Sequence, residues 1–122
     1  MSTGLIVFAH GSSVETANHA VRAVTAEVAR RGGLDWVETA FLEGGRPLLP
    51  QAVARLAERG ARRIVIVPYF LTLGLHLQRD LPRILDEIRR IHPDVDIQVT
   101  PPLDGHPALA DVVLARAREA SR

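Results

Sequence analysis

The stretch Ile64–Pro82, IVIVPYFLTLGLHLQRDLP, decides the fold of this chain. It opens with a continuous apolar run, Ile64 to Val67, which has the length and composition of a strand buried on both faces. The run leads into a loop that carries one imidazole, His76, and Gly74 permits a sharp turn just ahead of it. We therefore expect His76 at the carboxyl end of a strand, where open α/β sheets bind their ligands.

A helix is expected directly after this loop. Apolar residues recur at helical spacing from Leu81 to Ile91. Asp80 is a good N-cap residue, and Pro82 suits a first turn, where a missing N–H has no partner to lose. His92 lies next to Pro93 and is expected to cap the end of the helix. The sequence thus predicts a strand, a loop with a histidine, and a helix in succession.

The same alternation of strand and helix fills the rest of the chain. Each apolar run of strand length is followed by a segment with helical periodicity, and glycine or proline separates the two. Strands are expected at Leu5–Ala9, Trp36–Phe41, Arg63–Val67 and Val95–Thr100, and the other helices from about Val14 to the stop at Gly32-Gly33, from Pro47 to Arg59, and from Pro107 onward.

This order of elements predicts an α/β fold. Four strand–helix units in a row indicate a parallel sheet with right-handed crossovers and helices on both faces. Doubly wound sheets of this kind commonly have the strand order 2-1-3-4. In that order strands 2, 1 and 3 are neighbours, and the switch point lies between strands 1 and 3. Residues 1–122 are expected to form a single domain around a four-stranded sheet.

The composition excludes several classes of protein. The chain has no cysteine, so disulfides, thiolate metal sites and cysteine-ligated iron–sulfur clusters are ruled out. The net charge is +1, and all 15 basic residues are arginine, so no bulk field favours nucleic acid or a membrane surface. The first apolar run, Leu5 to Ala9, is too short for a signal peptide or a membrane span. We expect a cytoplasmic protein.

The loops after the three neighbouring strands carry His10, Glu43 and His76. Each residue follows its strand by a few positions at the same edge of the sheet. Two imidazoles and a carboxylate that meet there would bind a first-row divalent ion and leave positions open for a substrate. Without thiolates, this donor set suits cobalt, nickel, iron or zinc. The predicted crevice therefore has the chemistry of a metal site.

Each of these residues also has an ordinary interpretation. A single histidine at a strand end is commonly a satisfied polar group, and Glu43 beside two glycines is, on its own, typical of a solvated loop. His19 falls within a helix and is expected at the surface, and His106 precedes the last helix as a loop residue. A functional site is favoured because His10, Glu43 and the loop that carries His76 converge at one predicted crevice.

Ser12 has two possible roles at the start of the first helix. With Glu15 three residues later, it fits a capping box. Alternatively, the backbone N–H groups of Gly11, Ser12 and Ser13 can hold an anion at the helix N-terminus. A dinucleotide fingerprint is excluded, because the chain has no GxGxxG motif there.

Taken together, these motifs resemble the small-form sirohydrochlorin chelatases, which are class II tetrapyrrole chelatases. The resemblance covers almost the whole chain, and its motifs are more specific in combination than singly. The matching segments are Phe8-Ala9-His10-Gly11-Ser12, Ala40-Phe41-Leu42-Glu43 with Pro47, Val67-Pro68-Tyr69-Phe70-Leu71, Gly74-Leu75-His76 and Asp80-Leu81-Pro82.

The resemblance implies a flavodoxin-like fold and the insertion of a divalent metal, most often Co²⁺, with Fe²⁺ or Ni²⁺ as alternatives, into a metal-free tetrapyrrole. It implies that His10, Glu43 and His76 bind the metal and act in catalysis. No organic cofactor is needed, because the metal is a substrate. Two departures concern pigment and metal preference: Ser13 replaces a basic residue, and Gly44-Gly45-Arg46 replaces bulkier residues.

The tetrapyrrole carries many carboxylates, so Arg46, Arg79 and Ser12 are candidate substrate-binding residues, although both arginines also fit solvated loop positions. Longer relatives carry two such halves in one chain, and a flat pigment is better enclosed by two walls. We therefore expect a homodimer. A non-catalytic metal carrier or tetrapyrrole-binding module remains an alternative. A histidine phosphatase is disfavoured, because Ala9 stands where those enzymes have arginine.

Overall fold

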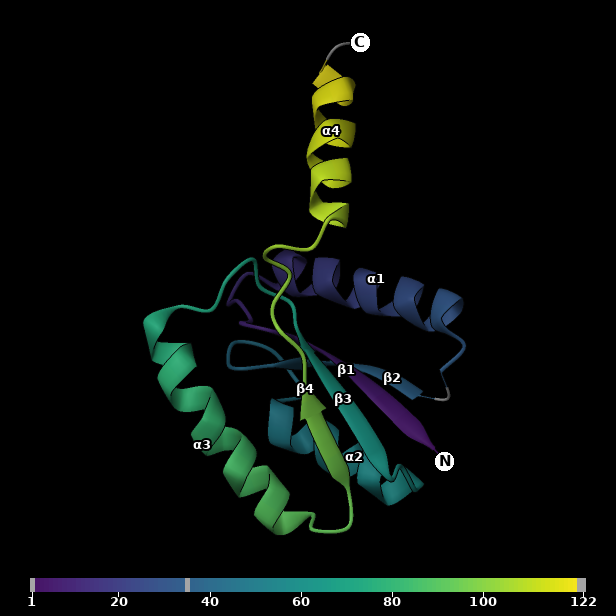
Figure 1. The fold of residues 1–122 in the computed structure, drawn as a ribbon, viewed down its shortest axis with the longest axis vertical. Helices are drawn as coiled ribbons and strands as arrows, with labels where there is room; N and C mark the ends of the chain where they lie inside the picture. The colour runs from purple at the N-terminus through teal and green to yellow at the C-terminus, as the bar shows by residue number, and fades with distance from the viewer. Residues whose placement is uncertain (1, 35, 121–122) are drawn as a thin grey trace.

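The computed structural model describes residues 2–34 and 36–120, and Figure 1 shows how the elements are arranged. Strands and helices alternate along the chain as predicted. The strands are β1 (Thr3–Ala9), β2 (Trp36–Phe41), β3 (Arg63–Pro68) and β4 (Asp96–Val99), and the helices are α1 (Glu15–Gly32), α2 (Leu49–Arg59), α3 (Leu75–Ile91) and α4 (Ala108–Ala120).

The four strands form one parallel sheet in the order β2-β1-β3-β4, which confirms the predicted order. β1 lies inside the sheet, and its Val7 pairs with Thr39 of β2 on one side and Val67 of β3 on the other. β2 is an edge strand, and the carboxylate of its Glu38 lies 3.6 Å from Arg55 of α2. Because all strands are parallel, their carboxyl ends lie at one edge of the sheet.

The main hydrophobic core lies between the sheet and two helices, α2 and α3. Alternate residues of β1 and β3 point into it, so every second side chain of these strands is fully buried. Burial of a large apolar side chain stabilises the fold by roughly 1.5–3 kcal/mol. The core includes Ile6, Phe8, Ala40, Leu49, Val53, Leu56, Ile64, Ile66, Leu81, Leu85, Ile88 and Ile97.

α1 covers the opposite face of the sheet, over β1 and β2. Its inward side is partly polar: Asn18 and Thr25 are buried, whereas its valines are half-buried. The hydroxyl of Thr39 donates a hydrogen bond to Thr25 Oγ1 at 2.7 Å, so this polar contact is satisfied. Helices on both faces are thus confirmed, with one face packed through polar groups.

α3 begins six residues earlier than the predicted Leu81, which corrects the expected placement of His76 in a loop. The helix starts at Leu75 after an extended Gly74, so His76 lies in its first turn. The N–H of Gln78 donates to the carbonyl of Gly74 at 2.9 Å and closes this turn.

Pro82 is consequently inside α3, and its prediction as a first-turn residue is wrong. Its ring removes the N–H that would bond to the carbonyl of Gln78. The helix continues because Leu77, in the added turn, extends the buried stripe that Leu81 and Leu85 form along the core. Burial of this extra side chain outweighs the missing hydrogen bond.

α4 stands away from the sheet and from the other three helices (Figure 1). None of its described residues is buried. Leu109, Val112 and Val113 recur at helical spacing along it; Leu109 is half-buried, and Val112 and Val113 are exposed. Among the helices described, none combines the length and the apolar character of a bilayer-spanning segment.

Pro82→Ala tests the interior position of the proline. The variant restores the missing N–H, so we expect its free energy of unfolding to rise by about 2 kcal/mol, the roughly 3 kcal/mol cost of an interior proline less the entropy proline removes from the unfolded chain. The matched control is Pro50→Ala in the first turn of α2, where little change is expected. Chemical denaturation measures both. Equal stabilities of wild type and Pro82→Ala would mean that α3 starts at the later position.

Candidate functional site

The site begins where β1 and β2 end, because the backbone pairing of these strands continues into their loops. The N–H of Leu42 donates to the carbonyl of Ala9 at 3.0 Å, and the N–H of Glu43 donates to that of His10 at 3.1 Å. His10 and Glu43 therefore hold adjacent positions in one continued ladder. Their side chains meet, with His10 Nε2 3.9 Å from Glu43 Oε1, and are 61% and 69% exposed.

The hydrogen bonds of His10 leave one ring nitrogen available. Nδ1 lies 3.2 Å from the carbonyl oxygen of Gly11. A carbonyl only accepts, so Nδ1 carries the proton and Nε2 keeps its lone pair. The ring also packs edge-on against Phe70, with 6.5 Å between centroids. Nε2 is therefore available, beside the Glu43 carboxylate, as a metal ligand or a proton acceptor.

Gly11 is required by the close approach of the two loops. A Cβ atom at this position would lie 1.6 Å from the carbonyl oxygen of Glu43. Gly11 also has φ +90°, a conformation that side chains disfavour. The contact continues at Gly44, where a Cβ would lie 2.9 Å from the Ser12 nitrogen. The absence of side chains at these two glycines allows His10 and Glu43 to meet.

Asn18 connects the same two loops from α1, and the sequence analysis missed it. Its side chain is 1% exposed. Nδ2 donates to the carbonyls of Ser12 at 2.9 Å and Gly44 at 3.1 Å, and Oδ1 accepts the N–H of Ser12 at 3.0 Å. An amide is one of the few side chains that both donates and accepts in this way. The sequence signal that could have identified it is an asparagine one turn after Glu15, on the side of the helix that faces the sheet.

The predicted capping box is wrong. α1 starts after Val14, and Ser12 Oγ accepts the N–H of Val14 at 3.0 Å in the turn before the helix. Glu15 instead accepts from Arg22 at 2.6 Å and from Asn18 at 3.1 Å. These hydrogen bonds, Arg22 first, lower the pKa of Glu15. The resulting stabilisation is present above the ordinary pKa of the carboxyl group and is lost as the pH falls through the lowered one.

His76 has a partner that occupies one of its nitrogens. Arg79 Nη2 lies 3.2 Å from His76 Nδ1. A guanidinium only donates, so Nδ1 accepts and the proton of the neutral ring sits on Nε2. Arg79 also contacts the carboxylate of Asp80, which in turn pairs with Arg83 at 2.9 Å. His76 is therefore exposed, and Arg79 is its hydrogen-bond partner.

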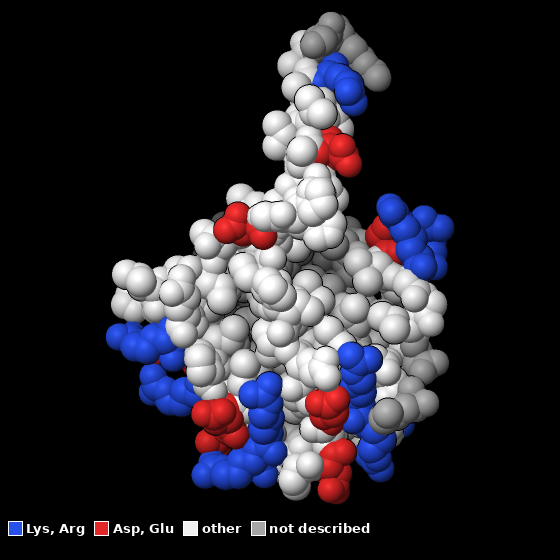
Figure 2. Space-filling view, in the orientation of Figure 1, with Lys and Arg blue, Asp and Glu red and all other residues white. Residues whose placement is uncertain are grey.

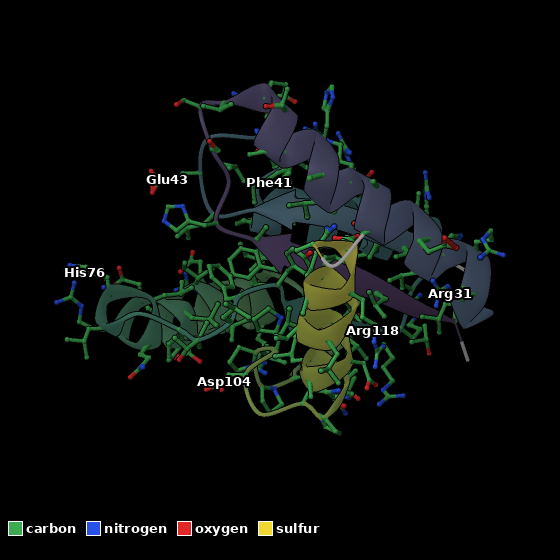
Figure 3. All side chains as sticks on the ribbon, turned by 90° about the horizontal axis from the view of Figure 1, so that it is seen from above. Arg31, Phe41, Glu43, His76, Asp104 and Arg118 are labelled. Atoms are coloured by element: carbon green, nitrogen blue, oxygen red, sulfur yellow. The ribbon has the colours of Figure 1, made fainter. Side chains whose placement is uncertain are left out.

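His10, Glu43 and His76 all line one pocket of about 460 Å³, at the carboxyl edge of the sheet. Leu42, Phe70 and Leu77 contribute its apolar wall. Figure 3 shows Glu43 and His76 on the same side of the molecule, at the loop after β2 and at the tip of α3. Within residues 2–34 and 36–120, no three His, Asp or Glu side chains stand close enough to enclose an ion. The pocket thus holds a pair of donors, with a third donor on another wall.

The remaining candidates lie around this pocket. Arg46 lines a second hollow of about 580 Å³ beside Glu43, together with Glu15 and Arg22. The N–H of Ser12 is used by Asn18, so the anion-binding role predicted for the N–H groups of this loop loses one of its donors.

The other histidines lie apart from the site, as predicted. His19 pairs with Glu15 on the surface of α1 at 3.6 Å. His92 is the C-cap residue of α3. His106 Nδ1 accepts the N–H of Ala108 at the start of α4, at 3.1 Å.

The fold is that of a chelatase-like α/β protein. The structure superimposes with a TM-score of 0.89 on the sirohydrochlorin chelatase SirB from Bacillus subtilis subspecies spizizenii, solved in complex with cobalt. The superposition covers 98% of this chain and 51% of that one at 22% identity, so it establishes the fold.

The CbiX family model matches residues 4–120, and the chain belongs to the CbiX family. Two curated relatives are both named sirohydrochlorin cobaltochelatase. The protein of Methanopyrus kandleri is 31% identical, with 95% of each chain covered. That of Methanosarcina acetivorans is 32% identical, over 96% of this chain and 95% of its own.

Gly11→Ala tests the close approach of the two loops, and Gly33→Ala is its matched control. Both glycines have positive φ, but a Cβ at Gly33 meets nothing within 4 Å. We expect Gly33→Ala to lower the free energy of unfolding by about 1 kcal/mol through backbone strain alone. Gly11→Ala should lower it at least twice as much, because the added carbon overlaps a backbone oxygen. Equal losses in chemical denaturation would mean that the loops do not touch.

Proposed function

We propose that this chain is a sirohydrochlorin chelatase that inserts a divalent metal ion into a metal-free tetrapyrrole. The observation that carries the proposal is the pocket lined by His10, Glu43 and His76 at the carboxyl edge of the sheet. Membership of the CbiX family supports it, as do relatives named cobaltochelatases, which favour Co²⁺ as the ion. Fe²⁺ and Ni²⁺ are the alternatives, and the product serves cobalamin, sirohaem or a related pathway.

Insertion exchanges two protons for one ion. The hydrated ion loses water ligands, two pyrrole N–H bonds break, and the freed nitrogen lone pairs bind the metal. The two protons pass to bases and then to water. The oxidation state of the metal does not change, and no electron is transferred. The protein must therefore hold the ion weakly, on one face of the ring, and place a proton acceptor beside the pyrrole nitrogens.

The pair His10 and Glu43 fits both requirements. Nε2 of His10 keeps its lone pair, and Glu43 adds a carboxylate at 3.9 Å. Imidazole and carboxylate suit first-row divalent ions. The exposure of both groups leaves the remaining positions of the ion open to water or pigment. Once the ion has left, the same two groups accept the pyrrole protons.

His76 joins the site when Arg79 moves. In the protein alone, Arg79 donates to His76 Nδ1 and so keeps the proton of the neutral ring on Nε2. A carboxylate of the tetrapyrrole is a stronger partner for a guanidinium than a neutral imidazole is. Binding of the pigment draws Arg79 away and releases His76 as a ligand or base. Arg46 and Ser12 lie where they can meet other polar groups of the same pigment.

The pocket needs a second wall, and a homodimer provides it. The site of one chain is open to solvent, as the exposure of His10 and Glu43 indicates. Exclusion of water from a flat pigment requires protein on both of its faces. A second copy of the chain is the simplest source, because two-fold dimers are the commonest oligomers.

A non-catalytic metal carrier or pigment-binding module is the second candidate, since the same residues would bind without turnover. Incubation with excess Co²⁺ and metal-free sirohydrochlorin separates the two by the absorption spectrum. Metallation of many pigments per chain means an enzyme. Metallation of one pigment per chain, or none, means a carrier. A histidine phosphatase is disfavoured by Ala9 beside His10.

Substitution of the site residues tests their roles. We expect His10→Ala, His76→Ala and Glu43→Gln each to lower kcat/KM for Co²⁺ insertion about a hundredfold, the typical contribution of a positioned acid or base. His19→Ala is the matched control, because His19 lies on α1 and pairs only with Glu15 among the contacts described. Circular dichroism checks the folding of every variant. Wild-type rates in folded His10→Ala and His76→Ala would refute the assigned roles.

Arg79→Ala tests the release of His76. Without the guanidinium, Nδ1 can carry the proton and Nε2 can bind metal, so we expect calorimetry to show tighter Co²⁺ binding in the absence of pigment. KM for the tetrapyrrole should rise in the same variant, because a carboxylate loses its partner. Arg83→Ala is the control, since Arg83 shares Asp80 with Arg79 but has, among the contacts described, none with His76. Weaker Co²⁺ binding by Arg79→Ala would show instead that the arginine assists metal binding directly.

A further inference from the structure

A second hollow shares a wall with the pocket of about 460 Å³ at the carboxyl edge of the sheet. It has a volume of about 580 Å³, and Glu15 and Arg22 of α1 line it together with Arg46 of the loop after β2. Leu42 and Glu43 line both the hollow and the pocket. A flat ligand that lies over the pocket therefore has this hollow at its rim. We call it the arginine hollow.

The guanidinium of Arg22 is fixed in place at one wall of the arginine hollow. Nη1 donates to the carboxylate of Glu15 at 2.6 Å, and Nη2 donates to the carbonyl of Arg46 at 3.3 Å. Cζ lies 5.3 Å from the centre of the Phe41 ring, which is within the range of a cation–π contact. Because these contacts already restrict the side chain, binding of a ligand costs it little further rotamer entropy.

The arginine hollow contains a cation that no carboxylate of this chain neutralises. Elsewhere, charged side chains gather in clusters where both signs adjoin, as at the lower edge of the molecule in Figure 2. In the hollow, Glu15 pairs with Arg22, and Glu43 faces His10 at 3.9 Å. Among the hydrogen bonds and ion pairs of the described residues, Arg46 takes part only through its carbonyl. Its guanidinium is therefore available to an anionic ligand.

A planar anion fits this pair of arginines. A guanidinium binds a carboxylate through parallel N–H···O bonds, and such charge-assisted bonds are stronger than neutral ones. Arg22 offers a fixed donor group on α1, and Arg46 offers an unpaired one on the facing loop. The tetrapyrrole of the proposed function has carboxylates on short, flexible arms at the rim of its ring. An arm that passes Glu43 reaches the arginine hollow while the ring stays over the neighbouring pocket.

We propose that the arginine hollow binds one carboxylate arm of the tetrapyrrole, with Arg22 as the fixed partner and Arg46 as the residue that closes over the arm. The inference rests on the proposed function and adds Arg22 to its binding residues. One anchored arm restricts rotation of the ring in its own plane, so that the pyrrole nitrogens face His10 and Glu43. A free anion such as phosphate shares this chemistry, and the experiments below separate the two.

Titration of the protein with metal-free sirohydrochlorin, in the absence of any metal ion, measures the contribution of the arginine hollow. We expect Arg22→Gln and Arg46→Gln each to raise the Kd of the pigment about tenfold, because glutamine keeps a donor but loses the charge. Arg30→Gln is the matched control, since Arg30 lies in the last turn of α1 and pairs with Glu27. Circular dichroism checks the folding of each variant. Wild-type Kd values in both folded variants would refute the inference.

Two further ligands identify what the arginines bind. With a pigment whose carboxylates are converted to primary amides, wild type and Arg46→Gln should have the same Kd, because the guanidinium has lost its partner. A tenfold difference that persists with the amide would overturn the inference, since the arginine would then act without a carboxylate. Calorimetry with inorganic phosphate should show binding at least a hundredfold weaker than that of the pigment. Phosphate binding as tight as pigment binding, and lost in Arg46→Gln, would assign the hollow to a free anion.

Binding without metal and turnover with Co²⁺ separate this inference from the proposed function. If the two arginine variants lose pigment affinity while wild type metallates at most one pigment per chain, the arginine hollow stands and the chelatase gives way to a carrier. If wild type metallates many pigments and Arg22→Gln and Arg46→Gln bind pigment as wild type does, the chelatase stands and the hollow is refuted. A wild-type protein that does not bind the pigment refutes both.

Discussion

The arrangement of this protein depends on one backbone ladder, in which the pairing of β1 and β2 continues beyond the strands into the next two loops. The bond from the Glu43 N–H to the carbonyl of His10 puts an imidazole and a carboxylate side by side before any side chain takes part. Gly11 is required because a carbonyl oxygen occupies the place of its Cβ. Asn18 then fixes both loops from α1. The geometry of the donor pair is thus a property of the main chain.

Sequence patterns were sufficient for the sheet and for bringing the three candidate residues to one pocket. Apolar runs of strand length, separated by helical periodicities, predict a parallel sheet, and the observed strand order is the one common in doubly wound sheets. Parallel strands place their carboxyl ends at one edge, so His10, Glu43 and His76 could be brought to one pocket on topology alone. What topology does not give is the distance between them, and His76 lies on another wall from the other two.

The features that were missed depend on tertiary contacts. α3 starts at Leu75 because burial of Leu77 compensates for Pro82 inside the helix, and local preferences alone favour a start next to the proline. The capping box fails because Glu15 is engaged by Arg22 and Asn18. Asn18 itself resembles any polar helix residue until the loops above it are in place. Each of these outcomes is set by groups distant in sequence from the residue concerned.

The isolation of α4 has a consequence for how the chain folds. The sheet with α1, α2 and α3 has its own core, to which α4 contributes no buried residue. A helix of 13 residues without packing is marginally stable in water, because nucleation is unfavourable and most helical stability comes from contacts with other elements. The helical content of this segment therefore depends on what it contacts, and on heating it should be lost before the rest of the molecule unfolds.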